Sequence, residues 1–259
     1  MHSVRKRFGQ HFLQDKQIIQ RIVDAIMPLP DQQIVEIGPG QGALTLPVLK
    51  KTGRLEVIEL DRDLIPQLKT RCADKGTLII HQADALKFDY AQLIHDAKPL
   101  RLIGNLPYNI STPLIFHLLK YAKNILDMHF MLQKEVVDRL VARTGTAAYS
   151  RLSIMVQYHC RINALFNVGP QAFYPPPQVD SSIVRLIPHQ EFLHKAQDFT
   201  HFANLVKSAF SHRRKTLRNC LKNIVSDTDW EKTQIDSQLR PEQISVAEYV
   251  KLSNTLVSI

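Results

Sequence analysis

Cysteine is scarce in this sequence of 259 residues, which contains only Cys72, Cys160 and Cys220. The three lie far apart and show no paired spacing, which argues against a disulfide framework and against a zinc site. We therefore expect no bound metal, and a protein that functions in a reducing compartment.

Long hydrophobic runs are also missing. The longest apolar stretches are far too short to span a bilayer. The first seven residues include Arg5, Lys6 and Arg7, but no apolar region of the kind found in export signals follows them. The sequence thus predicts a cytoplasmic protein with no membrane partner.

Positive charge is present in excess. The 33 Lys and Arg residues outnumber the 24 Asp and Glu residues, which gives a formal net charge of +9 and a pI near 9.5. Such a balance favours polyanionic partners, of which nucleic acid is the commonest. The length permits one large domain together with a small one.

Strand and helix patterns alternate over the first three quarters of the chain. Apolar, β-favouring runs predict strands at 33–37, 54–59, 77–81, 100–103 and 128–132, and a further strand after Ser181. Helical patterns follow Asp15, Ala43, Ser111 and Lys134. This alternation predicts an α/β domain with a mostly parallel sheet over 1–187, and the helical patterns that follow predict a small all-helical domain over 188–259.

A glycine-rich loop follows the first of these strands. Three of the 9 glycines fall within Gly38-Pro39-Gly40-Gln41-Gly42, which indicates close approach of the backbone to a ligand. The GxGxG spacing favours a nucleoside without a pyrophosphate. Glu59, 21 residues after Gly38, stands where a ribose diol finds its acceptor. Asp84 can accept from an adenine amino group or cap a helix, and the pattern leaves both open.

The turn Gly104-Asn105-Leu106-Pro107-Tyr108-Asn109 follows a buried strand. Asn105 offers a side-chain carbonyl, Leu106 a backbone carbonyl that Pro107 restrains, and Tyr108 a flat aromatic face. Two acceptors beside an aromatic ring suit a planar base with an exocyclic amine, whose nucleophilic form they would stabilise. The alternative is a plain strand-ending turn with a capping Asn and a packed Tyr.

A proline-rich segment, Phe173-Tyr174-Pro175-Pro176-Pro177, precedes the last strand of the α/β region. Its stiffness would hold Phe173 or Tyr174 in a set position, either as a second plate for a base or simply as core.

Two basic segments are candidate RNA contacts: Arg5-Lys6-Arg7, and the run with Arg213, Arg214, Lys215, Arg218 and Lys222. In a continuous helix, Arg214, Arg218 and Lys222 would share one face and could line up with phosphates. The alternative for both segments is a solvated surface.

Six motifs occur in a characteristic order: Phe8-Gly9-Gln10-His11-Phe12-Leu13, Glu36-Ile37-Gly38-Pro39-Gly40-Gln41-Gly42, Glu59-Leu60-Asp61, Asp84, Asn105-Leu106-Pro107-Tyr108, and the segment from Phe173 to Ser181. Together they closely resemble the ribosomal RNA adenine N6,N6-dimethyltransferases, in particular those of the bacterial small subunit. The resemblance covers nearly the whole chain. It implies a Rossmann-like class I methyltransferase fold and S-adenosyl-L-methionine as cofactor. It also implies dimethylation of two adjacent adenosines near the 3′ end of 16S rRNA, within an immature 30S subunit.

The resemblance also implies a role for each matching position. The cofactor would lie against His11, Leu13, Gly38 and Gly40, with Glu59 on its ribose, Asp84 on its adenine and Asn105 near the methyl donor. Asn105 and the Leu106 carbonyl would accept from the target amine, and Tyr108 and Phe173 would stack the target base. His11 stands where many members have Asn.

Other functions remain open at this point. A large-subunit rRNA adenine methyltransferase of the resistance type shares the same motifs, and a non-catalytic nucleic-acid-binding relative would share the fold. Methylation of protein glutamine or of DNA adenine uses similar Asn-Pro-Pro-Tyr turns. We expect the protein to act as a monomer.

Overall fold

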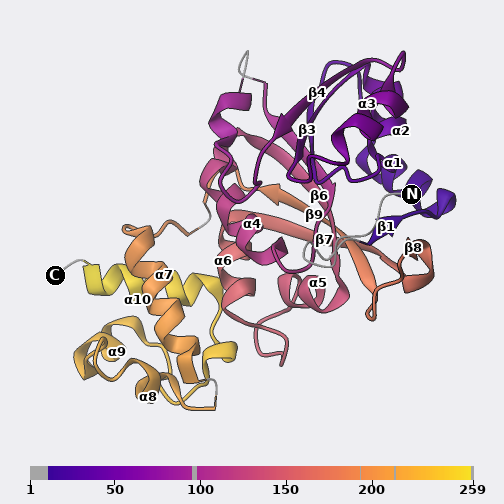
Figure 1. Cartoon of the computed structure of the whole chain (residues 1–259). Helices are drawn as coiled ribbons and strands as arrows, with labels where there is room; N and C mark the ends of the chain where they lie inside the picture. Colours follow the sequence, from indigo (N-terminus) through magenta and orange to yellow (C-terminus); the bar gives the residue numbers. More distant parts are fainter. Residues whose placement is uncertain (1–10, 95–97, 193, 213, 258–259) are drawn as a thin grey trace. The chain divides into compact units, whose positions relative to one another are not determined.

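The computed structural model describes residues 11–94, 98–192, 194–212 and 214–257 (Figure 1). The chain divides into two compact units, each described here by itself. Unit 1 comprises Met1–Val137 and Ile162–Pro188, and unit 2 comprises Asp138–Arg161 and His189–Ile259. The structure thus places Asp138–Arg161 with the helices beyond Pro188, whereas the sequence analysis assigned the whole of 1–187 to one domain.

Unit 1 is built on a seven-stranded sheet with the order β4-β3-β2-β5-β6-β9-β7. Its strands are β2 (Gln33–Ile37), β3 (Arg54–Glu59), β4 (Thr77–Gln82), β5 (Leu100–Asn105), β6 (Ile125–Gln133), β7 (Cys160–Val168) and β9 (Ser181–Pro188), and the first two residues of β7 belong to unit 2. The first five pair in parallel and β9 pairs antiparallel with β6. The predicted mostly parallel sheet is therefore confirmed, while strand β7 was not predicted.

The helices of unit 1 are α1 (Lys16–Ile26), α2 (Thr45–Thr52), α3 (Ile65–Cys72) and α4 (Ser111–Leu118). Helix α5 (Lys134–Leu140) follows at the end of β6 and continues into unit 2 after Val137. The Asp15 carboxylate caps α1 by accepting from the backbone N–H groups of Gln17 and Ile18. Apolar side chains of α1, α2 and α3 join one buried cluster with strands β2 and β3.

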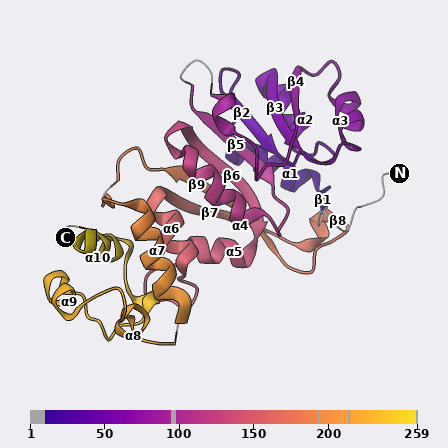
Figure 2. The same ribbon diagram turned by 60° about the vertical axis from the view of Figure 1, so that its left-hand side comes forward.

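A short antiparallel ribbon lies beside the main sheet, close to α1 (Figures 1 and 2). It is formed by β1 (Phe12–Leu13) and β8 (Phe173–Tyr174), with Leu13 opposite Phe173. The ribbon continues beyond β1, because the N–H of Gln14 donates to the carbonyl of Ala172 at 2.8 Å. It brings the start of the described chain to the proline-rich segment, a pairing of distant residues that no local pattern predicts.

Beyond Pro188 the described residues of unit 2 form helices joined by loops and no strand, as predicted. Its helices are α6 (Arg151–His159), α7 (Phe199–Ala209), α8 (Leu217–Leu221), α9 (Asp227–Thr233) and α10 (Val246–Val257). Among the residues that the structure describes, every helix is too short or too polar to traverse a bilayer.

The predicted basic helical face is wrong. Helix α8 has only five residues, so Arg214 lies in the turn before it and Lys222 in the turn after it. The helix begins at Leu217 because the N–H groups of Leu217 and Arg218 donate to the carbonyls of Leu239 and Ser237, which replaces a preceding helical turn. Arg218 is moreover bonded to Asp227 of α9 at 2.6 Å.

A buried carboxylate ties three strands of unit 1 together. Asp127 in β6 accepts from Arg101 Nε in β5 at 2.8 Å and from Arg185 Nη2 in β9 at 2.8 Å. Burial alone would raise the pKa of Asp127, but hydrogen bonds and charges from Arg101, His129 and Arg185 outweigh it, and the pKa is lowered. Arg101 Nη2 also donates to the carbonyl of Ile26, which fixes the end of α1.

Replacing this carboxylate tests its contribution to stability. Asp127→Asn removes the charge that compensates two guanidinium groups, and we expect it to lower the free energy of unfolding by about 3–5 kcal/mol. The matched control is Asp24→Asn, whose partner Lys51 is 3.7 Å away in an exposed pair and whose loss costs less than about 1 kcal/mol. Urea titration measures the free energy of unfolding of both variants. Equal decreases would show that the buried network contributes no more to stability than an exposed ion pair.

Candidate active site

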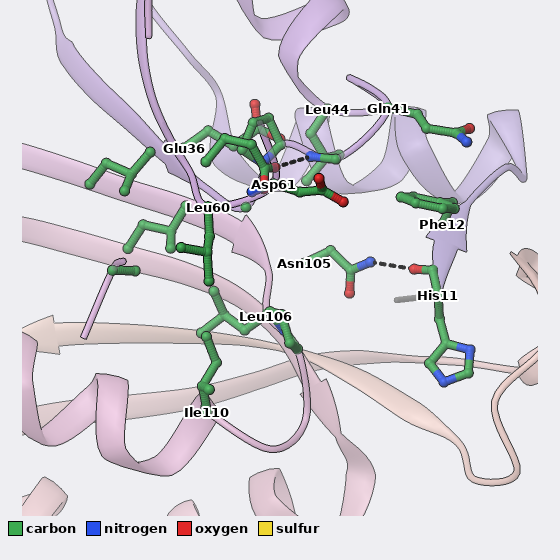
Figure 3. A pocket seen from close by; sticks show the side chains of 18 of the residues that line it. His11, Phe12, Glu36, Gln41, Leu44, Leu60, Asp61, Asn105, Leu106 and Ile110 are labelled. Carbon is green, nitrogen blue, oxygen red and sulfur yellow. Dashed lines mark hydrogen bonds between the residues drawn. The ribbon is translucent and has the colours of Figure 1, made fainter. Parts of the chain in front are cut away.

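A cavity of about 240 Å³ opens in unit 1 at the carboxyl ends of the parallel strands (Figure 3). This is the edge where open α/β sheets bind their ligands. Ten of the predicted site residues line it: His11, Leu13, Gly38, Gly40, Glu59, Asp84, Asn105, Leu106, Pro107 and Tyr108. Residues separated by nearly 100 positions in the chain thus meet at one site.

Five of the predicted site residues that the structure describes do not line the cavity. Phe173 is not among the residues that line the cavity. Arg214, Lys215, Arg218 and Lys222 are exposed residues of unit 2. Arg5, Lys6, Arg7 and Arg213 lie outside the described residues.

The glycine loop needs its glycines for backbone conformation. Gly38, Gly40 and Gly42 have φ values of +67°, +56° and +83°, which side chains rarely adopt. A Cβ atom at Gly40 would lie 3.2 Å from Cε1 of Phe12, and one at Gly42 would lie 2.8 Å from Cδ1 of Leu68. Gly40 and Gly42 are therefore packed closely against Phe12 and Leu68, while Gly38 and Gly40 also line the cavity.

Two predicted acidic residues stand on the cavity wall. Glu59 accepts from the N–H of Gly40 at 3.1 Å and from the N–H of Asp61 at 2.8 Å, so it joins the glycine loop to the end of β3. Burial raises the pKa of Glu59, an effect that these two hydrogen bonds oppose. Asp84 caps a turn through one oxygen, which accepts from the N–H of Leu86 at 3.0 Å. Asp84 lines the cavity as well, and the segment that it caps is a turn rather than the helix that the sequence left open.

The Asn105 amide has a defined orientation. Its Nδ2 donates to the backbone carbonyl of His11 at 3.0 Å (Figure 3). Because a carbonyl can only accept, the amide nitrogen must face His11, and the Oδ1 oxygen is the atom presented elsewhere. The carboxamide therefore borders the cavity with an acceptor available, which is the arrangement expected from the sequence.

The rest of the turn is fixed by neighbouring strands. The N–H of Leu106 donates to the carbonyl of Met131 at 3.2 Å, and the Tyr108 hydroxyl lies 2.8 Å from Ser181 Oγ. The Tyr108 ring stacks on the His11 ring with centroids 5.8 Å apart and planes at 29°. Gly104 is required because a Cβ there would lie 2.5 Å from the Ile37 carbonyl.

The structure does not bring Phe173 to the cavity. Its side chain is only 5% exposed and packs in the buried cluster that includes Leu13. Successive residues of a strand face opposite sides, so Phe173 faces the core and its neighbour Tyr174 is 61% exposed. Phe173 is therefore a core residue, which was one of the two alternatives that the sequence left open. This position does not support the stacking role expected for Phe173.

Sequence reasoning gave no role to Glu36, which lies in β2 and lines the cavity. Its carboxyl is buried and accepts from the Thr45 hydroxyl at 2.6 Å. Burial, helped by the charge of Glu59, raises the pKa of Glu36 to about 8, against the effect of the Thr45 hydrogen bond. The signal in the sequence was an acid inside an otherwise apolar strand directly before the glycine loop.

A change of Glu36 to its neutral isostere tests this protonation state. Because the folded chain holds the Glu36 proton up to about pH 8 and the unfolded chain releases it near pH 4.5, the contribution of Glu36 to the stability of the wild type falls as the pH rises between these values. Glu36→Gln keeps the hydrogen bond from Thr45 but cannot ionise. We expect its melting temperature to gain on the wild type from pH 5 to about pH 8, in thermal scans at each pH. Parallel curves for the two proteins would contradict a buried, protonated Glu36.

Comparisons with known proteins agree with this geometry. A model of the family "Ribosomal RNA adenine dimethylase" matches residues 1–258. The chain is 56% identical over 258 residues to a ribosomal RNA small subunit methyltransferase A of Pseudomonas aeruginosa, covering 100% of this chain and 96% of that protein. A protein of the same name from Chromohalobacter salexigens is 56% identical over 257 residues, or 98% of this chain and 91% of the relative.

Solved structures show the same fold. A dimethyladenosine transferase from Plasmodium falciparum superimposes with a TM-score of 0.80 at 28% identity, covering 93% of this chain and 96% of the other. The 23S rRNA methyltransferase ErmE superimposes with a TM-score of 0.73 at 22% identity, covering 95% and 99%, and that likeness concerns the fold alone. The Rossmann-like methyltransferase fold is thus confirmed, and the chain belongs to the ribosomal RNA adenine dimethylase family, enzymes that methylate ribosomal RNA.

Proposed function

We propose that this enzyme dimethylates the N6 amines of two adjacent adenosines in a loop near the 3′ end of 16S rRNA, with S-adenosyl-L-methionine as methyl donor. The observation that carries the proposal is the oriented Asn105 amide, whose nitrogen is bonded to the His11 carbonyl while the residue borders the cavity beside Tyr108. The small-subunit substrate is favoured by relatives of 56% identity that are named for it.

The cavity wall fits the cofactor. A Cβ at Gly38 would meet only the Asn105 carbonyl, at 4.0 Å, so a ligand can approach this backbone closely. Glu59 retains lone pairs for a ribose diol beyond the two N–H groups that it already accepts. Asp84 uses one oxygen in its turn and can offer the other to an adenine amino group. His11, Leu13 and Gly40 border the same space. S-adenosyl-L-methionine, when bound, supplies an electrophilic methyl group on its sulfonium.

The residues around Asn105 act on the target amine. The lone pair of an adenine N6 is delocalised into the ring, which makes the amine a poor nucleophile. Asn105 Oδ1 and the Leu106 carbonyl would accept from its two N–H bonds and favour the pyramidal form, in which the lone pair is localised. Because both acceptors are held in place before the substrate arrives, no reorganisation is needed at the moment of reaction.

Tyr108 supports the base once it has left its stack. Extruding a base costs a few kcal/mol, and less in a loop than in a duplex. One aromatic contact returns roughly 1–3 kcal/mol. Burial raises the pKa of Tyr108, against the effect of its hydrogen bond with Ser181, so the ring stays a neutral phenol at neutral pH.

The second methylation requires the pocket to accept an amine that already carries one methyl group.

The remaining parts of the proposal concern partner and place. We infer that the substrate is rRNA within an immature 30S subunit, that the enzyme acts as a monomer in the cytoplasm, and that exposed cations of unit 2 contact phosphates. Arg214, Lys215 and Lys222 are exposed there, whereas Arg218 is bonded to Asp227 and has less charge to offer.

Removal of the Asn105 amide tests the mechanism. We expect Asn105→Ala to lower kcat about 10²–10³-fold, the usual effect of losing one preorganised transition-state contact, with cofactor affinity nearly unchanged. The measurement is transfer of labelled methyl groups to small subunits that lack the modification, followed by mass spectrometry of the adenosines, together with calorimetric titration of the cofactor.

The same assay distinguishes the alternative functions. Wild-type enzyme offered large subunits in place of small ones should produce no dimethyladenosine, and product there would favour the 23S alternative. If Asn105→Ala turns over at the normal rate, the proposed mechanism is wrong. If the wild type gives no product on either subunit, a non-catalytic nucleic-acid-binding protein is favoured.

The cations of unit 2 are tested by a triple substitution. Arg214→Ala, Lys215→Ala and Lys222→Ala together should weaken binding to small subunits and reduce the log–log salt slope by roughly 2, at about 0.7 per phosphate contact. A matched triple variant of exposed lysines in unit 1, at Lys50, Lys69 and Lys75, removes the same charge. If both triples change the slope equally, net charge rather than a contact surface explains the binding.

A further inference from the structure

Ser181 touches the proposed catalytic turn without belonging to it. It is the first residue of β9 and is fully buried, with 0% exposure. Its Oγ lies 2.8 Å from the hydroxyl of Tyr108, a residue 73 positions earlier in the chain. No step of the proposed methyl transfer uses this serine, so its hydrogen bond calls for another explanation.

The two residues differ in how firmly their backbones are held. Tyr108 lies in the turn between β5 and α4, outside any strand or helix. Ser181 lies in a strand that pairs with β6 over six consecutive residues, from Gln133↔Ser181 to Met128↔Leu186. A hydrogen bond between them therefore transfers the rigidity of the sheet to the end of a side chain that borders the cavity.

We infer that Ser181 is a positioning residue that fixes the plane of the Tyr108 ring before the target base arrives. The inference rests on the proposed function, in which the base stacks on Tyr108. Stacking requires a ring in one orientation, and a ring left free would have to be immobilised each time a base enters. The Tyr108 ring is then held from two sides, by the Ser181 hydroxyl at its end and by the His11 ring on its face.

The neighbouring residue provides a matched control. Ser182 is buried to a similar degree, at 2% exposure, in the same strand. Its hydroxyl donates to the Phe166 carbonyl at 3.2 Å, so it also satisfies a hydrogen bond in the sheet. It makes no hydrogen bond to Tyr108. Loss of either hydroxyl should therefore affect the fold alike, and only one of the two should affect the ring.

The experiment compares Ser181→Ala, Ser182→Ala, Tyr108→Phe and the double variant Ser181→Ala/Tyr108→Phe. Methyl transfer to small subunits gives kcat/KM for the rRNA substrate, calorimetry gives cofactor affinity, and thermal scans give stability. We expect kcat/KM to fall about tenfold in Ser181→Ala, the scale of ordering one side chain. Cofactor affinity should not change, and Ser182→Ala should stay near the wild type.

The double variant separates positioning from general damage. Because Ser181→Ala and Tyr108→Phe break the same bond from opposite ends, the double variant should be no worse than either single variant. Equal losses in Ser181→Ala and Ser182→Ala, wild-type activity in Ser181→Ala, or losses that multiply in the double variant would each overturn the inference. If Ser181→Ala does not fold, Tyr108→Phe breaks the same bond with Ser181 intact, and wild-type activity there overturns it. Absence of methyl transfer by the wild type would instead refute the proposed function.

Discussion

One hydrogen bond, from the Asn105 amide nitrogen to the His11 backbone carbonyl, determines what the site can do. Without it the carboxamide could present either its nitrogen or its oxygen. His11, which supplies the carbonyl, directly precedes β1 of the ribbon. Its ring nitrogen Nδ1 lies 2.8 Å from the carbonyl of Pro175, the residue that follows β8. The motif that contains His11 and the proline-rich segment are far apart in the sequence, and together they orient the Asn105 amide that the proposed chemistry needs.

Charge distinguishes the two halves of the cavity. Glu59, Asp61 and Asp84 line the part near the glycine loop together with Glu36, which is protonated at neutral pH, and no Lys or Arg is found among the described residues that line it. Such a wall favours a cationic ligand. The part around Asn105 and Tyr108 offers neutral acceptors and an aromatic face, which suit an uncharged base. One sheet edge therefore provides two environments side by side, because its strands end in different residue types.

The sequence was sufficient for most of the fold, and it marked most of the residues that line the cavity near Asn105. Strand periodicity, the glycine loop and the acids at strand ends are local signals, and the cavity gathers the residues that they marked. The failures involve distant contacts. Phe173 pairs with Leu13, which turns its side chain into the core. Helix α8 begins late because its first N–H groups donate to the carbonyls of Ser237 and Leu239. The segment Asp138–Arg161 belongs to unit 2. Burial of Glu36 belongs to the same class, since its pKa depends on neighbours that only folding assembles.

The bond between Tyr108 and Ser181 has a consequence for biosynthesis. The cofactor-facing loops are complete once the chain has been translated to Tyr108, but the residues that anchor the ribbon and the aromatic ring, Pro175 and Ser181, come more than 60 residues later. A nascent polypeptide still held at residue 150 lacks the strand that pairs with β1 and the hydroxyl that is hydrogen-bonded to Tyr108. The ribbon and the aromatic ring can therefore reach their final positions only late in elongation, after β8 and Ser181 have been made.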